Sequence, residues 1–101
     1  MAKKIVELST KRKVELIEMS IDDIDTCTDI ATYHQSENGT YVKNLSKSRT
    51  AWLRRGIKGG DFEGFKKDSN GHPIDSVLKQ LSETEKNELV SLIQGYQNMG
   101  E

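Results

Sequence analysis

The residue types best suited to catalysis or metal binding are an aspartate-rich run, two histidines and one cysteine. The run DDIDTCTD, residues 22–29, has the composition of a calcium-binding loop but lacks the required glycine and the distant bidentate glutamate. Asp68-Ser69-Asn70-Gly71 lacks the same features and is typical of a turn. Residues 56–64 are rich in glycine but lack the Gly-Lys-Ser/Thr ending of a phosphate loop. We therefore predict neither a metal site nor a nucleotide site.

The histidines and the cysteine also give little support to catalysis. Any of the serines could be paired on paper with His34 or His72, so such a triad has no specificity. We expect His34 to meet the last carbonyls of a helix and His72 to cap one. Cys27 falls on an apolar stripe and should be a small buried hydrophobe with no thiol partner. We predict that the protein is not an enzyme and uses no cofactor.

Charge is distributed unevenly along a chain whose formal net charge is only −1. Residues 21–39 contain five acidic residues and no basic one, whereas residues 40–60 contain six basic residues and no acidic one. These six cations, with the single tryptophan Trp52 among them, indicate a contact surface. The predicted partner-binding residues are Lys43, Lys47, Arg49, Arg54, Arg55 and Lys58.

Three interpretations of this basic run are open. An acidic helix followed by a basic helix can neutralise itself if the two pack as an antiparallel hairpin. The cations can instead bind a protein with an acidic patch, including another copy of this chain through Asp22, Asp25 and Asp29. They can also follow nucleic-acid phosphates, with an exposed Trp52 stacking on a base. A pI of about 6.1 and the expected burial of Trp52 favour a protein partner over nucleic acid.

Hydrophobic spacing predicts a hairpin followed by helices. Two apolar segments, residues 5–8 and 14–19, flank the polar turn STKRK, so residues 1–19 should form a charged β-hairpin. Ser20 can cap a helix over about residues 21–35, which turns at Ser36-Glu37-Asn38-Gly39. Residues at three-to-four spacing define its expected buried stripe: Ile21, Ile24, Cys27, Ala31 and Tyr33 or His34. The stripe leaves Asp22, Asp25 and Asp29 on the outer face.

The second half predicts a further helix, a loop and two more helices. A helix should begin near Thr40 or Asn44, bury Trp52 and end at Gly56. Residues 56–71 should form a flexible loop that Phe62 and Phe65 hold against the core. A short helix follows with Pro73 at its first position, and the capping box Ser82-Glu83-Thr84-Glu85 opens the last helix, which fades at residues 97–100.

Length and composition indicate one small domain. The chain has 101 residues, of which 34% are hydrophobic and 31% charged, so the core must be thin. No apolar run approaches the length of a membrane span, and the N-terminus lacks the apolar segment of a signal peptide, so we expect no membrane contact. The predicted fold class is a single α+β domain over residues 1–101, with the hairpin followed by a small bundle of three to four helices.

The run IVELSTKRKVELIEMSIDDID joins two short charged strands to an acidic helix start and precedes a small helical remainder. In this organisation the chain resembles the small assembly proteins of tailed bacteriophages, and tail assembly chaperones are the nearest group. The resemblance implies a non-enzymatic protein of the host cytoplasm that binds phage structural proteins or copies of itself, or a minor structural protein of the virion. It carries over no residue roles. A further interpretation of the function is that the protein is a small inhibitor of a host protein.

Overall fold

The computed structural model describes residues 3–30, 32–36, 39–43 and 45–99, and measures 46 × 29 × 28 Å along its principal axes. For Lys3, residues 32–36 and 39–43, Leu45 and residues 98–99 the description covers the backbone alone. The strands are β1 (Lys3–Glu7), β2 (Lys13–Ile17), β3 (Thr32–Ser36), β4 (Gly39–Lys43) and β5 (Ile57–Gly60). The helices are α1 (Ile21–Ile30), α2 (Leu45–Gly56), α3 (Asp75–Leu78) and α4 (Glu83–Met99). This order confirms the α+β class and the N-terminal hairpin.

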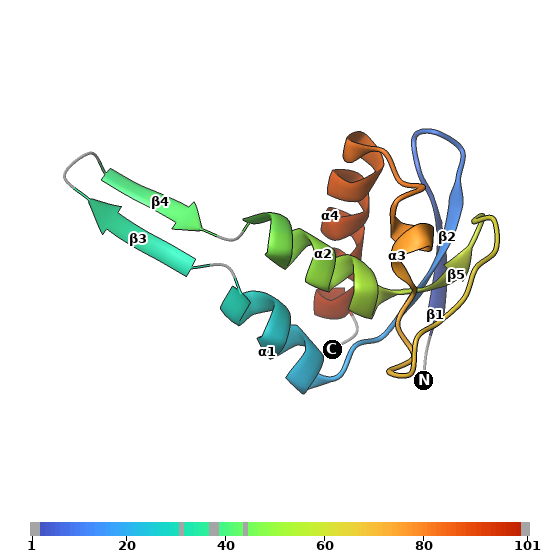
Figure 1. Cartoon of the computed structure of the whole chain (residues 1–101), viewed down its shortest axis with the longest axis horizontal. Helices are drawn as coiled ribbons and strands as arrows, with labels where there is room; N and C mark the ends of the chain where they lie inside the picture. Colours follow the sequence, from blue (N-terminus) through green and yellow to red (C-terminus); the bar gives the residue numbers. More distant parts are fainter. Residues whose placement is uncertain (1–2, 31, 37–38, 44, 100–101) are drawn as a thin grey trace.

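The main sheet has three antiparallel strands in the order β1-β2-β5 (Figure 1). In β2 the side chains of Val14 and Leu16 are fully buried, which is the alternation expected of a sheet with one face on the core. Residues 57–60 form strand β5 of this sheet, so the prediction that the flexible loop begins at residue 56 was wrong. Gly60 has a φ of +131°, and a Cβ there would lie 2.5 Å from the Lys13 carbonyl oxygen. This glycine permits close backbone approach rather than a loose loop.

Helices α2 and α4 pack on this sheet and contribute five of the thirteen buried residues in the core cluster. Leu53 of α2 and Leu89 and Ile93 of α4 are almost completely buried, and Trp52 is 8% exposed, which confirms its role as a core anchor. The predicted capping box is present at the start of α4. Ser82 Oγ accepts the Glu85 amide at 3.1 Å, and Glu85 Oε1 accepts the Ser82 amide at 2.9 Å. The capping residues therefore fix where α4 begins.

The first predicted helix is shorter than expected. Helix α1 ends at Ile30, and β3 and β4 form a separate two-stranded sheet, here called the β3–β4 arm, that projects beyond α1 and α2 (Figure 1). His34 therefore lies in a strand and not at a helix end. Both strands contain threonine and tyrosine, and β4 also has a valine, all of which favour strands. The Asn-Gly pair is a stronger hairpin signal than a helix stop.

The expected stripe of α1 is only partly correct. Cys27 is fully buried and Ile24 packs against the core, but Ile21 is 76% exposed because it lies at the first turn, outside the contact with α2. Ala31 lies outside the described residues. Helix α2 begins at Leu45, so the later of the two predicted starts, near Asn44, is the closer one.

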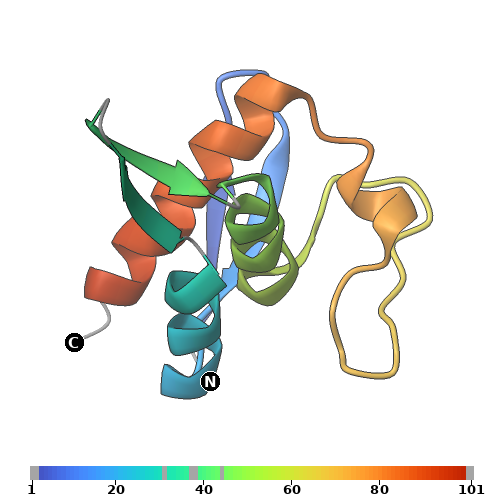
Figure 2. The ribbon, with the colours of Figure 1, turned by 60° about the vertical axis from the view of Figure 1, so that its left-hand side comes forward.

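The segment between β5 and α3 forms a long loop on the side of the molecule away from the β3–β4 arm (Figure 2). Phe62 and Phe65 are partly buried against the core with ring centroids 5.9 Å apart, as predicted. Pro73 precedes α3 by two residues, and Ile74 is the N-cap. The predictions that Pro73 is the first helical residue and that His72 is a cap were therefore wrong. An isolated bridge from Lys67 to Pro73 holds Pro73 in extended backbone instead.

Candidate functional site

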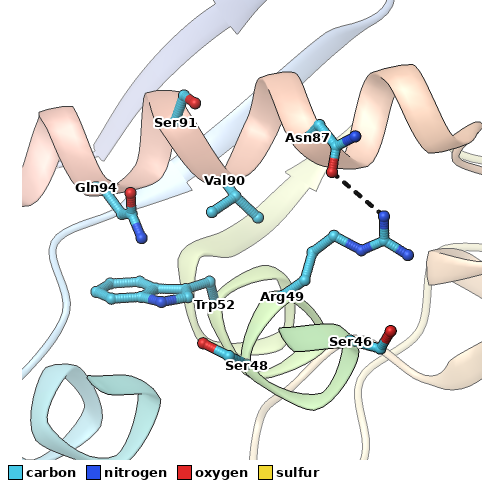
Figure 3. A pocket seen from close by; sticks show the side chains of 8 residues that line it. All are labelled: Ser46, Ser48, Arg49, Trp52, Asn87, Val90, Ser91 and Gln94. Atoms are coloured by element: carbon cyan, nitrogen blue, oxygen red, sulfur yellow. Dashed lines mark hydrogen bonds between the residues drawn. The ribbon is translucent and has the colours of Figure 1, made fainter. Parts of the chain in front are cut away.

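The cations of α2 do not share one surface, because the helix carries them on different sides. Arg49 faces α4, where its Nη1 donates to Glu83 Oε2 at 2.5 Å and to Asn87 Oδ1 at 3.2 Å (Figure 3). Arg49 lies with Trp52 along a groove of about 510 Å³ between α2 and α4. Its Nε is buried without a hydrogen-bond partner, and a ligand cannot reach it there. Arg49 thus holds the two helices together.

Arg54 and Arg55 also contact carboxylates within the chain. Arg54 donates through Nη1 to the Pro73 carbonyl oxygen at 3.0 Å and through Nη2 to Asp75 Oδ1. Arg55 Nε lies 3.7 Å from Asp23 Oδ1 on α1. The pair with Asp23 agrees with the helix-hairpin interpretation, whereas Arg54 uses a carboxylate far along the chain.

Arg54 and Arg55 nevertheless meet further cations in one cavity of about 190 Å³, which we call the basic cavity. The cavity lies between the end of α2, the connection from β2 to α1, and the loop at residues 67–72. Four cations and a histidine line it: Arg54, Arg55, Lys58, Lys67 and His72. Its lining also includes two acidic residues, Glu18 and Asp23. Cations therefore outnumber carboxylates around this space.

The loop at residues 67–72 is held in place by Asp68. Asp68 Oδ1 accepts the amides of Asn70 at 2.8 Å and His72 at 3.0 Å, and the Asp68 amide donates to the His72 carbonyl oxygen at 2.7 Å. The hydrogen bond from the His72 amide lowers the pKa of Asp68 below its usual value, so this turn stays intact at neutral pH. The Lys67–Pro73 bridge closes the loop beside Arg54. The cavity wall is thus built by local backbone contacts.

Two of the cavity's cations lack an ion-pair partner among the described residues. Within the described residues no ion pair involves Lys67 or Lys58, the second residue of β5. Lys67 is exposed and Lys58 is half-buried. Both ammonium groups can therefore meet an external anion without first breaking a structural contact.

The remaining predicted site residues lie elsewhere. Lys47 is exposed on the outer side of α2, beside a shallow hollow that Arg54 and Arg55 also line. Lys43 belongs to β4, and its side chain lies outside the described residues. Lys67 and His72 were missed, because they follow the basic run by nine residues or more and no periodicity links the two segments. The Asn70-Gly71 pair predicted a turn, and this was the one sequence signal for the loop that forms this wall of the basic cavity.

The cysteine does not form a reactive site. Cys27 is fully buried, and its burial raises the pKa of the thiol to about 11, so the group stays protonated at neutral pH. The Cys27 carbonyl oxygen accepts the hydroxyl of Ser48 at 3.2 Å, which joins α1 to α2. These contacts confirm the prediction of a small buried hydrophobe.

No group of histidine, cysteine, aspartate and glutamate side chains suited to a metal ion occurs in the described part of the chain. Among the described helices, none combines the length and apolar character needed to cross a bilayer. No protein-family model, curated protein or solved structure matches the chain.

Proposed function

We propose that this protein is a non-enzymatic interaction module whose basic cavity binds a carboxylate on an acidic segment of a partner protein. The observation that carries the proposal is the excess of cations in that cavity, where Lys58 and Lys67 have no counter-ion among the described residues. Three of the six predicted contact residues line the same space, namely Arg54, Arg55 and Lys58. The proposal therefore narrows the contact surface from a whole helix to one cavity.

The size of the cavity favours one anionic group over a whole small molecule. Sites for drug-sized ligands measure about 300–1,000 Å³, whereas the basic cavity measures about 190 Å³. A single carboxylate can enter it while the rest of its chain lies across the surface. Lysine suits such a contact because its ammonium group is a compact charge on a flexible stem.

Nucleic acid is the second candidate, and the same unpaired lysines are the observation in its favour. Binding to a nucleic-acid backbone needs several cations along the path of successive phosphates. Here Arg49 faces α4 and is held by Glu83, and Trp52 lines the groove between α2 and α4 but is only 8% exposed, which leaves little of its ring for a base. The distribution of cations supports an acidic protein segment better.

The resemblance to tail assembly proteins remains part of the proposal. A partner with an acidic segment would then be another phage structural protein, and binding would occur in the host cytoplasm or within the virion. The β3–β4 arm suits such a role, because an isolated two-stranded sheet leaves both outer edges open for contacts.

The test is to measure fluorescence anisotropy of a labelled oligo-glutamate peptide at low ionic strength. The wild type should bind it, and Lys58→Glu with Lys67→Glu should weaken binding at least tenfold. The matched control is Lys66→Glu with Lys79→Glu, which makes the same change in net charge at two exposed lysines outside the cavity lining. The control pair should retain most of the binding.

Two outcomes would contradict the proposal. Equal losses of peptide binding in both double variants would mean that the affinity depends on net charge alone. Tighter binding of a labelled oligothymidylate than of the peptide, with loss in the cavity variant, would favour nucleic acid.

A further inference from the structure

Helix α1 presents an acidic stripe, defined by Asp22, Asp25 and Asp29, on the side opposite its buried face. The three residues recur at i, i+3 and i+7, all three are exposed, and Cys27 on the other side is fully buried. No ion pair involves any of them within the described residues. These three carboxylates thus have no ion-pair partner in the part of the chain whose side chains are described.

The same helix shows that its carboxylates and the cavity's cations can pair. Asp23, which lies on another side of α1, lines the basic cavity and approaches Arg55 Nε at 3.7 Å. The stripe cannot follow it into that cavity, because Asp25 and Asp29 face away from the contact between α1 and α2. The unpaired acids and the unpaired lysines of one molecule therefore remain separate.

An exposed apolar side chain accompanies the stripe. Ile21 is 76% exposed and lies four residues before Asp25, hence on a neighbouring part of the same helix surface. A single exposed aliphatic side chain is common on protein surfaces, so Ile21 adds apolar contact area beside the stripe but does not by itself argue for association.

We propose that the acidic stripe of one copy docks on the basic cavity of a second copy, with a carboxylate of Asp25 or Asp29 entering the cavity. This inference rests on the proposed function and names its partner. We take the contact as head-to-tail, with each copy using its stripe on one neighbour and its cavity on another, so an open assembly has one free stripe and one free cavity at its ends. Contacts of this kind between exposed charges are individually weak and screened by salt. Association is therefore concentration-dependent and falls as ionic strength rises.

Sedimentation velocity with two complementary variants tests the inference. Asp25→Asn with Asp29→Asn removes two charges of the stripe but keeps the cavity, and Lys58→Ala with Lys67→Ala does the reverse. All four positions lack ion pairs in the described structure, and circular dichroism and thermal melts check that each variant folds.

Wild type should show a series of species that grows with concentration and disappears at high salt. Each double variant alone should sediment as a monomer, and an equimolar mixture should form one dimer, because one stripe and one cavity remain. Self-association of either variant to the wild-type extent would overturn the head-to-tail contact. A monomeric wild type that still binds oligo-glutamate would overturn this inference and leave the proposed function standing. Loss of both would overturn both.

Discussion

Two charged clusters of this molecule differ in how many of their charges have a counter-ion among the described residues. Where the β1–β2 turn meets the start of α4, Glu85 is 5% exposed and accepts hydrogen bonds from Thr10 Oγ1 at 2.7 Å and Arg12 Nε at 2.9 Å. Arg12 also lies 5.2 Å from the centre of the Phe62 ring. In the basic cavity, by contrast, Lys58 and Lys67 have no counter-ion among the described residues.

The difference separates charges that hold the fold from charges that are available to a partner. Burial alone raises the pKa of Glu85, but the hydrogen bonds from the Ser82 amide, Thr10 and Arg12 outweigh it and lower the pKa to about 2. The Arg12–Glu85 cluster therefore contributes to stability, because each charge has its partner inside the chain. Lys58 and Lys67 of the basic cavity lack such partners among the described residues, so their charges should contribute little to stability.

The largest expected effect is at the completed cluster. Glu85→Ala leaves Arg12 and Thr10 without their acceptor and removes the capping box, so we expect a loss of about 2–3 kcal/mol in the free energy of unfolding, measured by urea titration. The control is Glu7→Ala, whose side chain is exposed and takes part in no ion pair within the described residues, so it should matter much less. Equal losses in the two variants would remove the special role of Glu85.

The pH dependence of this loss sharpens the same comparison. The pKa of Glu85 is about 2 in the folded protein, below the ordinary 4.5, so its contribution is fully present above the ordinary value. That contribution is lost as the pH falls from 4.5 towards 2. The stability difference between wild type and Glu85→Gln should therefore be constant near neutral pH and shrink in that acidic range. A difference that does not change with pH would contradict the assigned hydrogen bonds.

An intermediate effect is expected at Arg54, which belongs to the basic cavity but also contacts the loop that leads into α3. Arg54→Ala loses the hydrogen bond to the Pro73 carbonyl oxygen, and we expect destabilisation of about 1 kcal/mol by thermal or urea unfolding. Arg54→Lys, which retains the charge but not the two-pronged contact, should recover part of it. No change in Arg54→Ala would mean that this arginine is as unconstrained as the lysines.

The smallest effect on folding is expected at the two unpaired lysines. Lys58→Ala with Lys67→Ala should change the free energy of unfolding by no more than about 0.5 kcal/mol, because neither side chain has an ion-pair partner among the described residues. The same variant should still lose oligo-glutamate binding. A large loss of stability would place these lysines with Glu85, among the charges that hold the fold.

Local patterns predicted the parts of the fold that depend on nearby residues. The two apolar segments on either side of the polar turn STKRK predicted the hairpin, and the Ser82–Glu85 spacing predicted the cap of α4, because both signals act within a few residues. Strand β5 was missed because its pairing with β2 joins positions more than forty residues apart, such as Val14 and Gly60. The end of α1 was missed because the three-to-four spacing of apolar residues continues past Ile30, where the chain instead enters the β3–β4 arm.

The candidate site was predictable only in part for the same reason. The charge pattern identified Arg54, Arg55 and Lys58 as one group, since they lie within five residues of one another. Which of them would be neutralised depended on carboxylates such as Asp75, which the fold brings from another segment. Lys67 joins the cavity through the backbone of the loop that Asp68 holds, and no sequence period encodes that contact.

The most direct measurement of the central claim is a two-dimensional amide NMR titration of the isotope-labelled protein with oligo-glutamate at low ionic strength. The account predicts that the largest shift changes occur at residues 54–58 and 67–72, which line the basic cavity, and that they disappear when salt is added. Shift changes centred instead on Lys47 and Arg49, or on the β3–β4 arm, would contradict the account. So would a spectrum that the peptide leaves unchanged.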